Sequence, residues 1–418
     1  MEIPEVPKPL LEALTQAAAG ERCALVGGVV RDLLLHRHHE DPWRGLPDLD
    51  VVVEGRAADL VQRLPKALER RFGFSIPLSL QEHGAFGTFE VELELPAEFG
   101  GTWLLDVASA RQETYPEPGE NPTVRPGSLR DDLARRDFAV NAMALELSTG
   151  ELLDFHHGQS DLSARQLNLL HSSSLRDDPT RWVRGARYAA RLGFQFSKAT
   201  QQQALKTLEQ WPWRWRTGDD PAQVPPALGT RLRMELELLF KREPWLNALA
   251  ELKSVGGLSL LDPEMQRSNR YVRVLKYAQR FQIEMLTALV AGTSQPLMLS
   301  TRLQLPQRQH RIIEASLSLS EKILKAQRQF GDLSYMKPSW WTHLLESPGF
   351  SFEAVCLTFA CQDKPSRPIW QWITKWRFVA SPKSAIQIMT DEGIPPGPLL
   401  GERLRELRAN ELDSLSLK

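Results

Sequence analysis

The sequence predicts an α+β protein, in which a small mixed β-sheet is followed by an all-helical remainder. Short apolar runs alternate with glycine and proline over residues 1–150, a spacing typical of strands joined by turns. Beyond Asp154, apolar residues recur at three- and four-residue intervals, which is typical of helices. Hydrophobic residues make up 42% of the chain and charged residues 25%, as in ordinary globular proteins. A chain of 418 residues is long enough for roughly two to four domains.

The first 150 residues are expected to form four strands and a short strand end, with one or two helices and a helix start at 29–35. Glycine and proline bound each apolar run, and one longer run has the apolar spacing of a helix. Residues 111–128 are rich in proline, glycine and polar side chains, so we expect a long loop without regular structure. The expected strands are 24–26, 51–53, 86–95, 103–107 and 138–147, and the expected helix is 57–71.

The remainder is expected to be helical throughout. Four prolines between residues 211 and 229 interrupt the pattern and indicate a soft boundary. We therefore expect a mixed-sheet head at 1–150, a helical neck at 151–215, and a helical body and tail at 216–418. The expected neck and body helices are 161–170, 178–192, 200–210 and 230–240.

Composition argues against several classes of protein. No apolar run is long enough to span a bilayer, and the first residues lack the basic and apolar regions of a secretory signal. The three scattered cysteines argue against a disulfide framework and against a cysteine-based zinc site. We expect a cytoplasmic protein that has no membrane partner.

Charge is unevenly distributed along the chain. Residues 1–150 contain 15 basic and 25 acidic side chains, whereas the rest contains 36 basic and 27 acidic ones. The basic part can bind along a phosphate backbone, or its charged side chains can simply be the solvated surface of the helices. Charge alone does not favour either interpretation. One helix face is a candidate footprint for a phosphate backbone, although a solvated face has slightly more weight; it comprises Arg270, Arg273, Lys276 and Arg280. The cluster of Trp211, Trp213 and Trp215 fits base stacking or helix packing, and we favour packing.

Two motifs close together in the head point to nucleotide chemistry. Asp48 and Asp50 stand two apart beside a predicted strand, so their carboxylates share a face, and such an oxygen-rich pair suits Mg²⁺. Alone, the pair is more simply read as solvated turn residues. Just before it, Gly27-Gly28 joins a strand end to a helix start, where backbone N–H groups bind anions, and Arg31 adds a cation. Together they predict a phosphate cradle beside a metal site.

This pairing resembles the head domain of class II tRNA nucleotidyltransferases, the family of CCA-adding enzymes and bacterial poly(A) polymerases. Residues 83–88 resemble the family's Phe-Gly-Thr strand. Residues 132–142 (Asp-Leu-Ala-Arg-Arg-Asp-Phe-Ala-Val-Asn-Ala) resemble its Asp-x-x-Arg-Arg-Asp-Phe-Thr-x-Asn-Ala segment, and residues 177–187 its Glu-Asp-x-x-Arg segment. Residues 392–401 resemble a tail segment of these enzymes.

The resemblance implies a fold and a set of roles. The head at 1–150 is expected to be catalytic and to resemble DNA polymerase beta. The neck at 151–215 is expected to recognise the base, and the body and tail at 216–418 to bind tRNA. Asp48 and Asp50 are expected to hold two Mg²⁺ ions, with Asp106 on a neighbouring strand as a candidate third carboxylate. Gly28 and Arg31 are expected to contact the triphosphate. Nucleotide binding is carried over to Arg136, with Asn141 supporting it.

Base choice is expected to depend on Asp178, Arg181, Arg184 and Arg187, which are spaced three apart. On one helix they form a slowly drifting stripe, which is either a solvated face or a base-reading surface. Cytosine and adenine both present an amine beside a ring-nitrogen acceptor, so one carboxylate and one guanidinium can bind either base. Uracil and guanine present the opposite pattern. The family assigns this reading to the positions of Asp178 and Arg181.

The expected function is template-independent addition of CCA to tRNA 3′ ends from CTP and ATP, with release of pyrophosphate. An A-adding enzyme or a poly(A) polymerase would share every motif. The loop at 111–128 weighs against a CC-only enzyme, and a pI near 6.8 weighs mildly against a poly(A) polymerase. A catalytically inert RNA-binding scaffold is the alternative outside this class. The chain departs from the family pattern at Asp177, at Ala139 and at His156-His157. We expect the two histidines to be surface or packing residues rather than a metal site.

Overall fold

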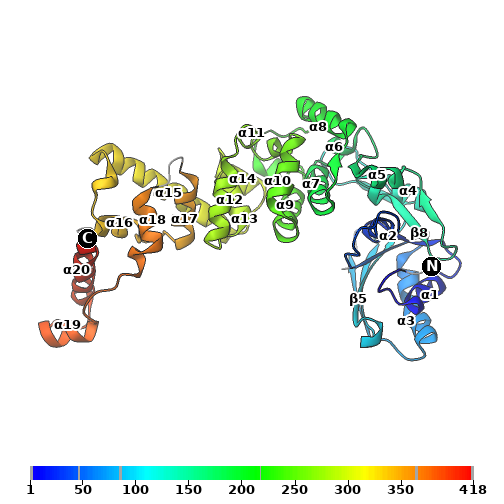
Figure 1. The fold of residues 1–418 in the computed structure, drawn as a ribbon, viewed down its shortest axis with the longest axis horizontal. Coiled ribbons are helices and arrows are strands. Elements are labelled where there is room, and N and C mark those ends of the chain that lie inside the picture. The colour runs from blue at the N-terminus through cyan, green and yellow to red at the C-terminus, as the bar shows by residue number, and fades with distance from the viewer. Residues whose placement is uncertain (1–2, 46–47, 84–86, 217, 363–365, 416–418) are drawn as a thin grey trace. The chain divides into compact units, whose positions relative to one another are not determined.

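A computed structural model describes residues 3–45, 48–83, 87–216, 218–362 and 366–415. These residues form two compact units, one of residues 1–219 with 223–257 and one of residues 220–222 with 258–418. The first unit is built on a mixed sheet and the second is helical, so the predicted α+β class is confirmed (Figure 1). The predicted domain boundaries at residues 150 and 215 stay predictions.

The sheet of the first unit has the strand order β3-β4-β5-β2-β1-β8-β9. Neighbouring strands are antiparallel except β2 and β5, which run parallel. The predicted strand at 86–95 begins among residues 84–86, which lie outside the described part of the chain. The strands are β1 (Cys23–Val26), β2 (Leu49–Val53), β3 (Leu78–His83), β4 (Thr88–Glu94), β5 (Thr102–Ser109), β8 (Met143–Glu146) and β9 (Leu152–Asp154).

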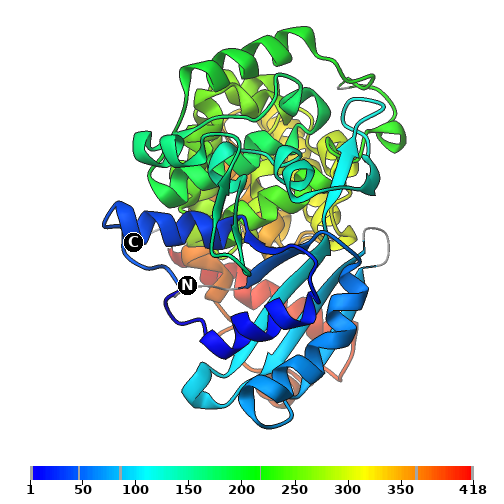
Figure 2. The ribbon, with the colours of Figure 1, turned by 90° about the vertical axis from the view of Figure 1, so that its right-hand side faces the viewer.

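The two faces of the sheet are covered differently. On one face, alternate apolar side chains such as Val51, Leu105 and Leu25 are fully buried. The amphipathic helices α1 (Lys8–Ala17) and α3 (Ala57–Phe72) pack on each other, and α3 packs on β2, β4 and β5 (Figure 2). Because side chains alternate along a strand, Asp50 and Asp106 point to the opposite face.

That opposite face is covered at one end by the short helix α4 (Leu129–Ala134). Ser128 and Asp131 form a reciprocal capping box that fixes where α4 begins. Leu129 and Leu133 of α4 pack with Val26, Val52, Ala144 and their neighbours into a buried cluster. The carboxylates of Asp50 and Asp106 lie beyond this cluster, where the sheet faces a cavity.

The predicted joint between strand and helix at the double glycine is confirmed. β1 ends at Val26 and α2 (Gly28–His38) begins two residues later. Gly27 has φ 73° and ψ −130°, a conformation that side-chain-bearing residues rarely adopt. The tight bend turns the first backbone N–H groups of α2 toward the cavity side of the sheet.

The predicted structureless loop at 111–128 is wrong. It contains a hairpin of β6 (Arg111–Thr114) and β7 (Thr123–Pro126), paired antiparallel. The strands are polar and short, so they give no apolar alternation. Pro126 sits at the last pair of the hairpin, where the missing N–H is tolerated.

Two other element predictions need correction. The predicted strand at 138–147 begins instead with a 3₁₀ turn, η2 (Ala139–Asn141), because the Asp137 carboxylate accepts from the Phe138 N–H and the Asn141 amide. The predicted helix at 161–170 is α5 (Gly158–Ala164), which ends where Arg165 adopts φ 51°. The chain then enters β10 (Gln166–Leu167), paired with β11 (Gln195–Phe196).

The predicted neck and body helices are present with adjusted ends. Trp213 and Trp215 are buried, and Trp213 packs edge-on against Trp182, which confirms the packing interpretation. None of the helices in the described ranges is both long and apolar enough to cross a membrane. The helices of the first unit are completed by α6 (Ser174–Asp177), α7 (Thr180–Leu192), α8 (Lys198–Gln210), η3 (Pro221–Gln223, partly in the second unit), α9 (Thr230–Arg242) and α10 (Trp245–Ser254).

The second unit is helical, and its basic helix face is largely engaged within the unit. Arg270 and Arg273 donate to the carbonyls of Cys361 and Gln362, and the Arg280 guanidinium lies 4.7 Å from the Trp370 ring. These contacts favour a structural role for most of the candidate footprint. The helices are α11 (Pro263–Arg267), α12 (Arg270–Arg280), α13 (Met285–Ala291), α14 (Pro296–Arg302), α15 (Gln307–Phe330), α16 (Pro338–Leu345), α17 (Phe352–Cys361), α18 (Arg367–Thr374), α19 (Ala385–Glu392) and α20 (Pro398–Ser414).

Replacing Gly185 with alanine is expected to destabilise the first unit by about 1–3 kcal/mol. A Cβ at Gly185 would lie 2.5 Å from the Phe196 ring and 2.6 Å from the Phe138 ring, so α7 would be pushed away from these two rings. Gly401→Ala in α20 is the matched control, because its nearest neighbour is a flexible Arg405 tip at 3.5 Å. Helix propensity should make that control neutral or slightly stabilising. Calorimetric unfolding of both variants checks this, and equal shifts would contradict it.

Candidate active site

One cavity of about 890 Å³ in the first unit brings together every site residue predicted from the sequence. Its walls come from the sheet, α2, the 111–126 hairpin, α7 and α9. Ten arginines and eight acidic side chains line it, so a polyanion with bound cations is a suitable occupant. The predicted residues among the lining are Gly28, Arg31, Asp48, Asp50, Asp106, Arg136, Asn141, Asp178, Arg181, Arg184 and Arg187.

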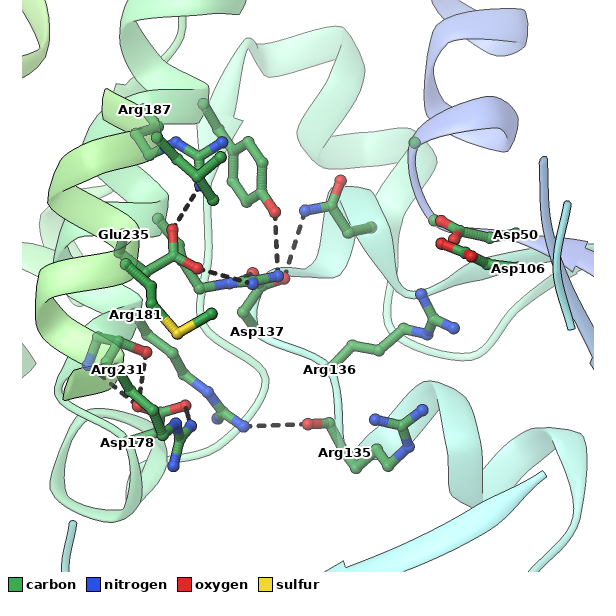
Figure 3. A pocket seen from close by; sticks show the side chains of 18 of the residues that line it. Asp50, Asp106, Arg135, Arg136, Asp137, Asp178, Arg181, Arg187, Arg231 and Glu235 are labelled. Carbon is green, nitrogen blue, oxygen red and sulfur yellow. Dashed lines mark hydrogen bonds and ion pairs between the residues drawn. The ribbon is translucent and has the colours of Figure 1, made fainter. Parts of the chain in front are cut away.

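Carboxylates gather at one end of this cavity. Asp50 and Asp106 are directly opposite each other in the parallel register of β2 and β5, and their side chains lie together in Figure 3. Asp48 is exposed and immediately precedes β2. Burial raises the pKa of Asp50 to about 6; nearby Arg136 opposes the shift, while Asp48 and Asp106 add to it. Burial and Asp48 also raise the pKa of Asp106.

These carboxylates fit a divalent cation that has further ligands. Mg²⁺ commonly uses one or two carboxylates and completes its shell with water and phosphate oxygens. Within the described residues, no three His, Cys, Asp or Glu side chains are grouped closely enough to hold an ion by themselves. The pair of Asp50 and Asp106, with exposed Asp48 nearby, therefore suits an ion shared with a bound triphosphate.

The Gly27 bend lies against the acidic end. A Cβ at Gly27 would come 3.1 Å from Asp50 Oδ2 and 3.1 Å from Arg136 Nη1. Only a glycine lets the backbone approach both side chains this closely. Arg31, one turn into α2, is buried, and its guanidinium donates to Asp32 and to Asn141 Oδ1 at 2.8 Å. Its charge is thus balanced by Asp32, a partner that sequence reasoning did not single out.

Two arginines occupy the middle of the cavity. Asp132 is fully buried and accepts from Arg135 at 2.7 Å and from Arg136 at 3.0 Å. Burial would raise the pKa of Asp132, but the charges of Arg136 and Arg135 lower it. Glu113 of β6 also accepts from Arg135, at 3.0 Å. Figure 3 shows Arg136 between the carboxylates and the polar wall formed by α7 and α9.

Asp178 does not belong to the helix that carries the arginines, which corrects the predicted single stripe. It has ψ 94°, and α7 begins at Thr180. Its carboxylate instead caps this start, accepting from the Thr180 N–H at 3.0 Å and hydroxyl at 2.6 Å. Arg231 of α9 forms an ion pair with the other Asp178 oxygen. Arg181 donates to the backbone carbonyl of Arg135 at 3.0 Å.

Arg184 and Arg187 project from α7 into a network with α9. Arg184 donates to Asp137 at 2.8 Å and to Glu235 at 3.2 Å, and Arg187 donates to the same Glu235 (Figure 3). Sequence reasoning missed Arg231 and Glu235. They lie four residues apart on one helix face, a pattern that ordinary solvated helices share. Asp137 lies in the segment 132–142 that resembles the family, but its ion pair with Arg184 was not predicted.

Asp137→Asn is expected to flatten the loss of stability below pH 4. Burial alone would raise the pKa of Asp137, but the charge and hydrogen bonds of Arg184 lower it to about 2. The folded state therefore gains stability above about pH 4 and loses it as the pH falls toward 2. The Arg184 side chain is 38% exposed, so we expect a screened contribution of about 1–2 kcal/mol. Urea unfolding at pH 6 and pH 3, with exposed Asp59→Asn as control, measures it; an unchanged pH dependence in Asp137→Asn would contradict the pairing.

Comparison with known proteins agrees with this arrangement. The family model of the poly A polymerase head domain matches residues 23–168. An A-adding tRNA nucleotidyltransferase of Aquifex aeolicus is 29% identical over 419 residues, covering 94% of this chain and 45% of the relative. A CC-adding tRNA nucleotidyltransferase of Deinococcus radiodurans is 43% identical over 180 residues, or 42% of each chain. This chain thus spans about half the length of these relatives.

A solved structure shares the fold over nearly the whole chain. The Thermotoga maritima CCA-adding enzyme complexed with tRNA superposes with a TM-score of 0.67 at 22% identity, covering 99% of this chain and 93% of that one. At that identity the likeness concerns the fold, in which a mixed-sheet head precedes a helical remainder.

Proposed function

We propose that the protein is a tRNA nucleotidyltransferase that adds CCA to tRNA 3′ ends from CTP and ATP. The match of residues 23–168 to the poly A polymerase head domain and the similarity to an A-adding tRNA nucleotidyltransferase support the proposal. One observation carries the proposal. A single cavity holds paired carboxylates, a glycine bend at a helix start and a polar wall that contains Asp178 and Arg181. These are the parts needed for metal, triphosphate and base.

Asp50 and Asp106, with Asp48, would hold Mg²⁺ at the acidic end. Two bound Mg²⁺ ions would lower the pKa of the primer hydroxyl and neutralise charge on the α-phosphate and the leaving pyrophosphate. The protein's own contribution is alignment. The parallel register of β2 and β5 sets two carboxylates side by side, and Gly27 lets the backbone approach them.

Arg136 and the start of α2 would bind the triphosphate. The Arg136 guanidinium lies between the carboxylates and the α7 wall, which is where the phosphates of a metal-bound nucleotide would extend. Asp132 orients it without removing its remaining N–H donors. Backbone N–H groups at Gly28 and the next residues of α2 add anion-binding capacity. Arg31 would contribute mainly by supporting α2, because Asp32 already balances its charge.

Asp178 and Arg181 would read the base, with Arg184 and Arg187 shaping the pocket. Asp178 keeps acceptor capacity because a carboxylate has about four lone-pair sites. Arg181 donates through one nitrogen to the Arg135 carbonyl and retains further N–H donors. A base that presents a carbonyl and an N–H in place of an amine and an acceptor would leave both groups unpaired, a mismatch worth several kcal/mol.

An A-adding specialist is the second candidate. The Aquifex aeolicus relative, which matches 94% of this chain, carries that name. The hairpin at 111–126 favours an enzyme that adds adenosine over a CC-only enzyme, since CC-adding members of the family lack a loop in this region. All the interactions described above would serve either enzyme.

Three tRNA substrates distinguish these activities. We expect tRNA ending at the discriminator base to be extended to CCA with CTP and ATP, tRNA ending in CC to gain one adenosine, and tRNA ending in CCA to remain unchanged. Extension of only the CC-ended tRNA, by ATP alone, would indicate the A-adding specialist. Repeated adenosine addition to the CCA-ended tRNA would indicate a poly(A) polymerase.

A further inference from the structure

A histidine outside the predicted site is bonded to the backbone that carries the central arginines. His171 Nε2 lies 2.6 Å from the carbonyl oxygen of Ala134, the last residue of α4. A carbonyl can only accept, so the Nε2–H of His171 donates. The last carbonyls of a helix lack partners within it, and histidine side chains are among the groups that satisfy them. The next two residues are Arg135 and Arg136.

The turn that carries His171 precedes α6 and Asp178, which is part of the proposed base-reading wall. The Gln203 amide donates to the carbonyls of His171 and Ser172, at 2.9 and 2.8 Å. The Ser174 hydroxyl, at the start of α6, accepts from the His171 N–H at 3.2 Å. α6 ends at Asp177, directly before Asp178. His171 therefore belongs to a fixed turn that precedes Asp178 by seven residues.

We propose that His171 is a positioning residue, an inference that rests on the proposed function. His171 couples Arg136, which binds the triphosphate, to the wall that contains Asp178 and Arg181. Its imidazole joins the end of α4, which aims Arg136, to the turn that leads into Asp178. Arg181 makes a parallel link through the Arg135 carbonyl. These two hydrogen bonds, to the carbonyls of Ala134 and Arg135, hold residues 134–136 at a set distance from α6 and α7.

The ring of His171 is itself held in place. The His156 ring packs edge-on against it, with centroids 6.4 Å apart. His156 thus has a packing role, as expected for a histidine at that position. Although the His171 side chain is solvent-exposed, its Nε2–H is directed at one carbonyl, and truncating an exposed side chain opens no core cavity.

Nucleotide affinity in His171→Ala, His171→Gln and Ser172→Ala tests the coupling. Loss of one hydrogen bond should raise the Kd and KM for CTP and ATP by up to about tenfold, with kcat changed much less. His171→Gln retains an N–H donor and should recover most of the affinity. Ser172→Ala, at the exposed neighbour, should bind as wild type does. His171→Phe keeps the ring without the donor and should behave like His171→Ala, so the result does not depend on a single variant.

A double-mutant cycle with Arg136→Ala separates coupling from general destabilisation. If His171 acts through Arg136, His171→Ala should have no further effect on Kd in the Arg136→Ala background. The same fold-change in both backgrounds, or an unchanged Kd in His171→Ala, would overturn the inference. Equilibrium binding does not require turnover. A wild-type protein that binds CTP but extends no tRNA would therefore refute the proposed function, while the cycle would still decide the role of His171.

Discussion

Asp50→Asn is expected to lower nucleotide incorporation into tRNA by on the order of a thousandfold or more, while the protein stays folded. The amide keeps the size of the side chain but cannot supply the anionic oxygen that a divalent cation needs. Asp106, its partner in the register of the neighbouring strand, would remain, but the site would lose one of its anionic ligands. Incorporation of labelled CTP and ATP at saturating Mg²⁺ measures the loss.

The same substitution should increase the free energy of unfolding above pH 6. Burial, Asp48 and Asp106 raise the pKa of Asp50 to about 6, against the partial opposition of Arg136. A carboxyl whose folded pKa is raised destabilises the fold when it is ionised, so this cost is present above pH 6 and disappears below about pH 4. In metal-free buffer at pH 8, Asp50→Asn should gain about 2 kcal/mol, and the gain should vanish toward pH 4.

Glu92→Gln is the matched control for this experiment. Glu92 is exposed on β4 and is paired in register with Leu104 rather than with the acidic pair. It should retain wild-type activity and stability. An Asp50→Asn protein that keeps more than a tenth of the activity would contradict the role of Asp50 as a metal ligand. Wild-type protein that is inert in the same assay would instead support the RNA-binding scaffold.

Gly27→Ala is expected to have the second-largest effect, lowering activity by on the order of a hundredfold. With φ 73° at this residue, a side chain adds backbone strain of about 1–3 kcal/mol. Its Cβ would also lie 3.1 Å from both Asp50 Oδ2 and Arg136 Nη1, so the metal ligand and the phosphate ligand must both shift. Steady-state kinetics and thermal unfolding together separate the two consequences.

Gly20→Ala isolates the strain from the displacement. Gly20 has φ 93°, and no heavy atom within 4 Å would meet an added Cβ. That variant should lose stability like Gly27→Ala but keep its activity. If both variants lose activity to the same extent, the close approach of Gly27 to the two side chains has no catalytic consequence.

Much of the fold could be predicted because its strands alternate and its helices are amphipathic. β5 buries alternate residues, as a strand with one face on the core does. β2 is recognisable instead by its apolar run 51–53, since Val52 is buried on the other face of the sheet with Leu129 and Leu133 of α4. The 111–126 hairpin could not be found in that way, because β6 has no apolar residue and β7 has only Val124 and Pro126 among its four residues. The break before α7 did leave a signal. Pro179 disfavours helical geometry at Asp178, which therefore lies outside the helix.

Residue spacing alone predicted only the parts of the site that lie close together in the sequence, whereas the roles of Arg136 and Asp178 depended on the family resemblance. Asp48 and Asp50 are two apart, and Gly27, Gly28 and Arg31 form one short motif, so local spacing was enough. Arg231 and Glu235 lie about fifty residues beyond their partners, Asp178 and Arg187 respectively. Their selection depends on how α9 packs on α7, and nothing in the local charge pattern of α9 distinguishes a buried partner from a solvated one.

The most direct test is incorporation of each labelled ribonucleoside triphosphate, offered singly, into tRNA ending at the discriminator base and tRNA ending in CC. With Mg²⁺ present, CTP should extend the first substrate and ATP the second, whereas UTP and GTP should be used at least about a hundredfold less efficiently. Chelation of divalent cations should abolish every transfer. Equal use of all four triphosphates, or transfer that persists after chelation, would contradict an acidic metal site working beside a wall that selects the base.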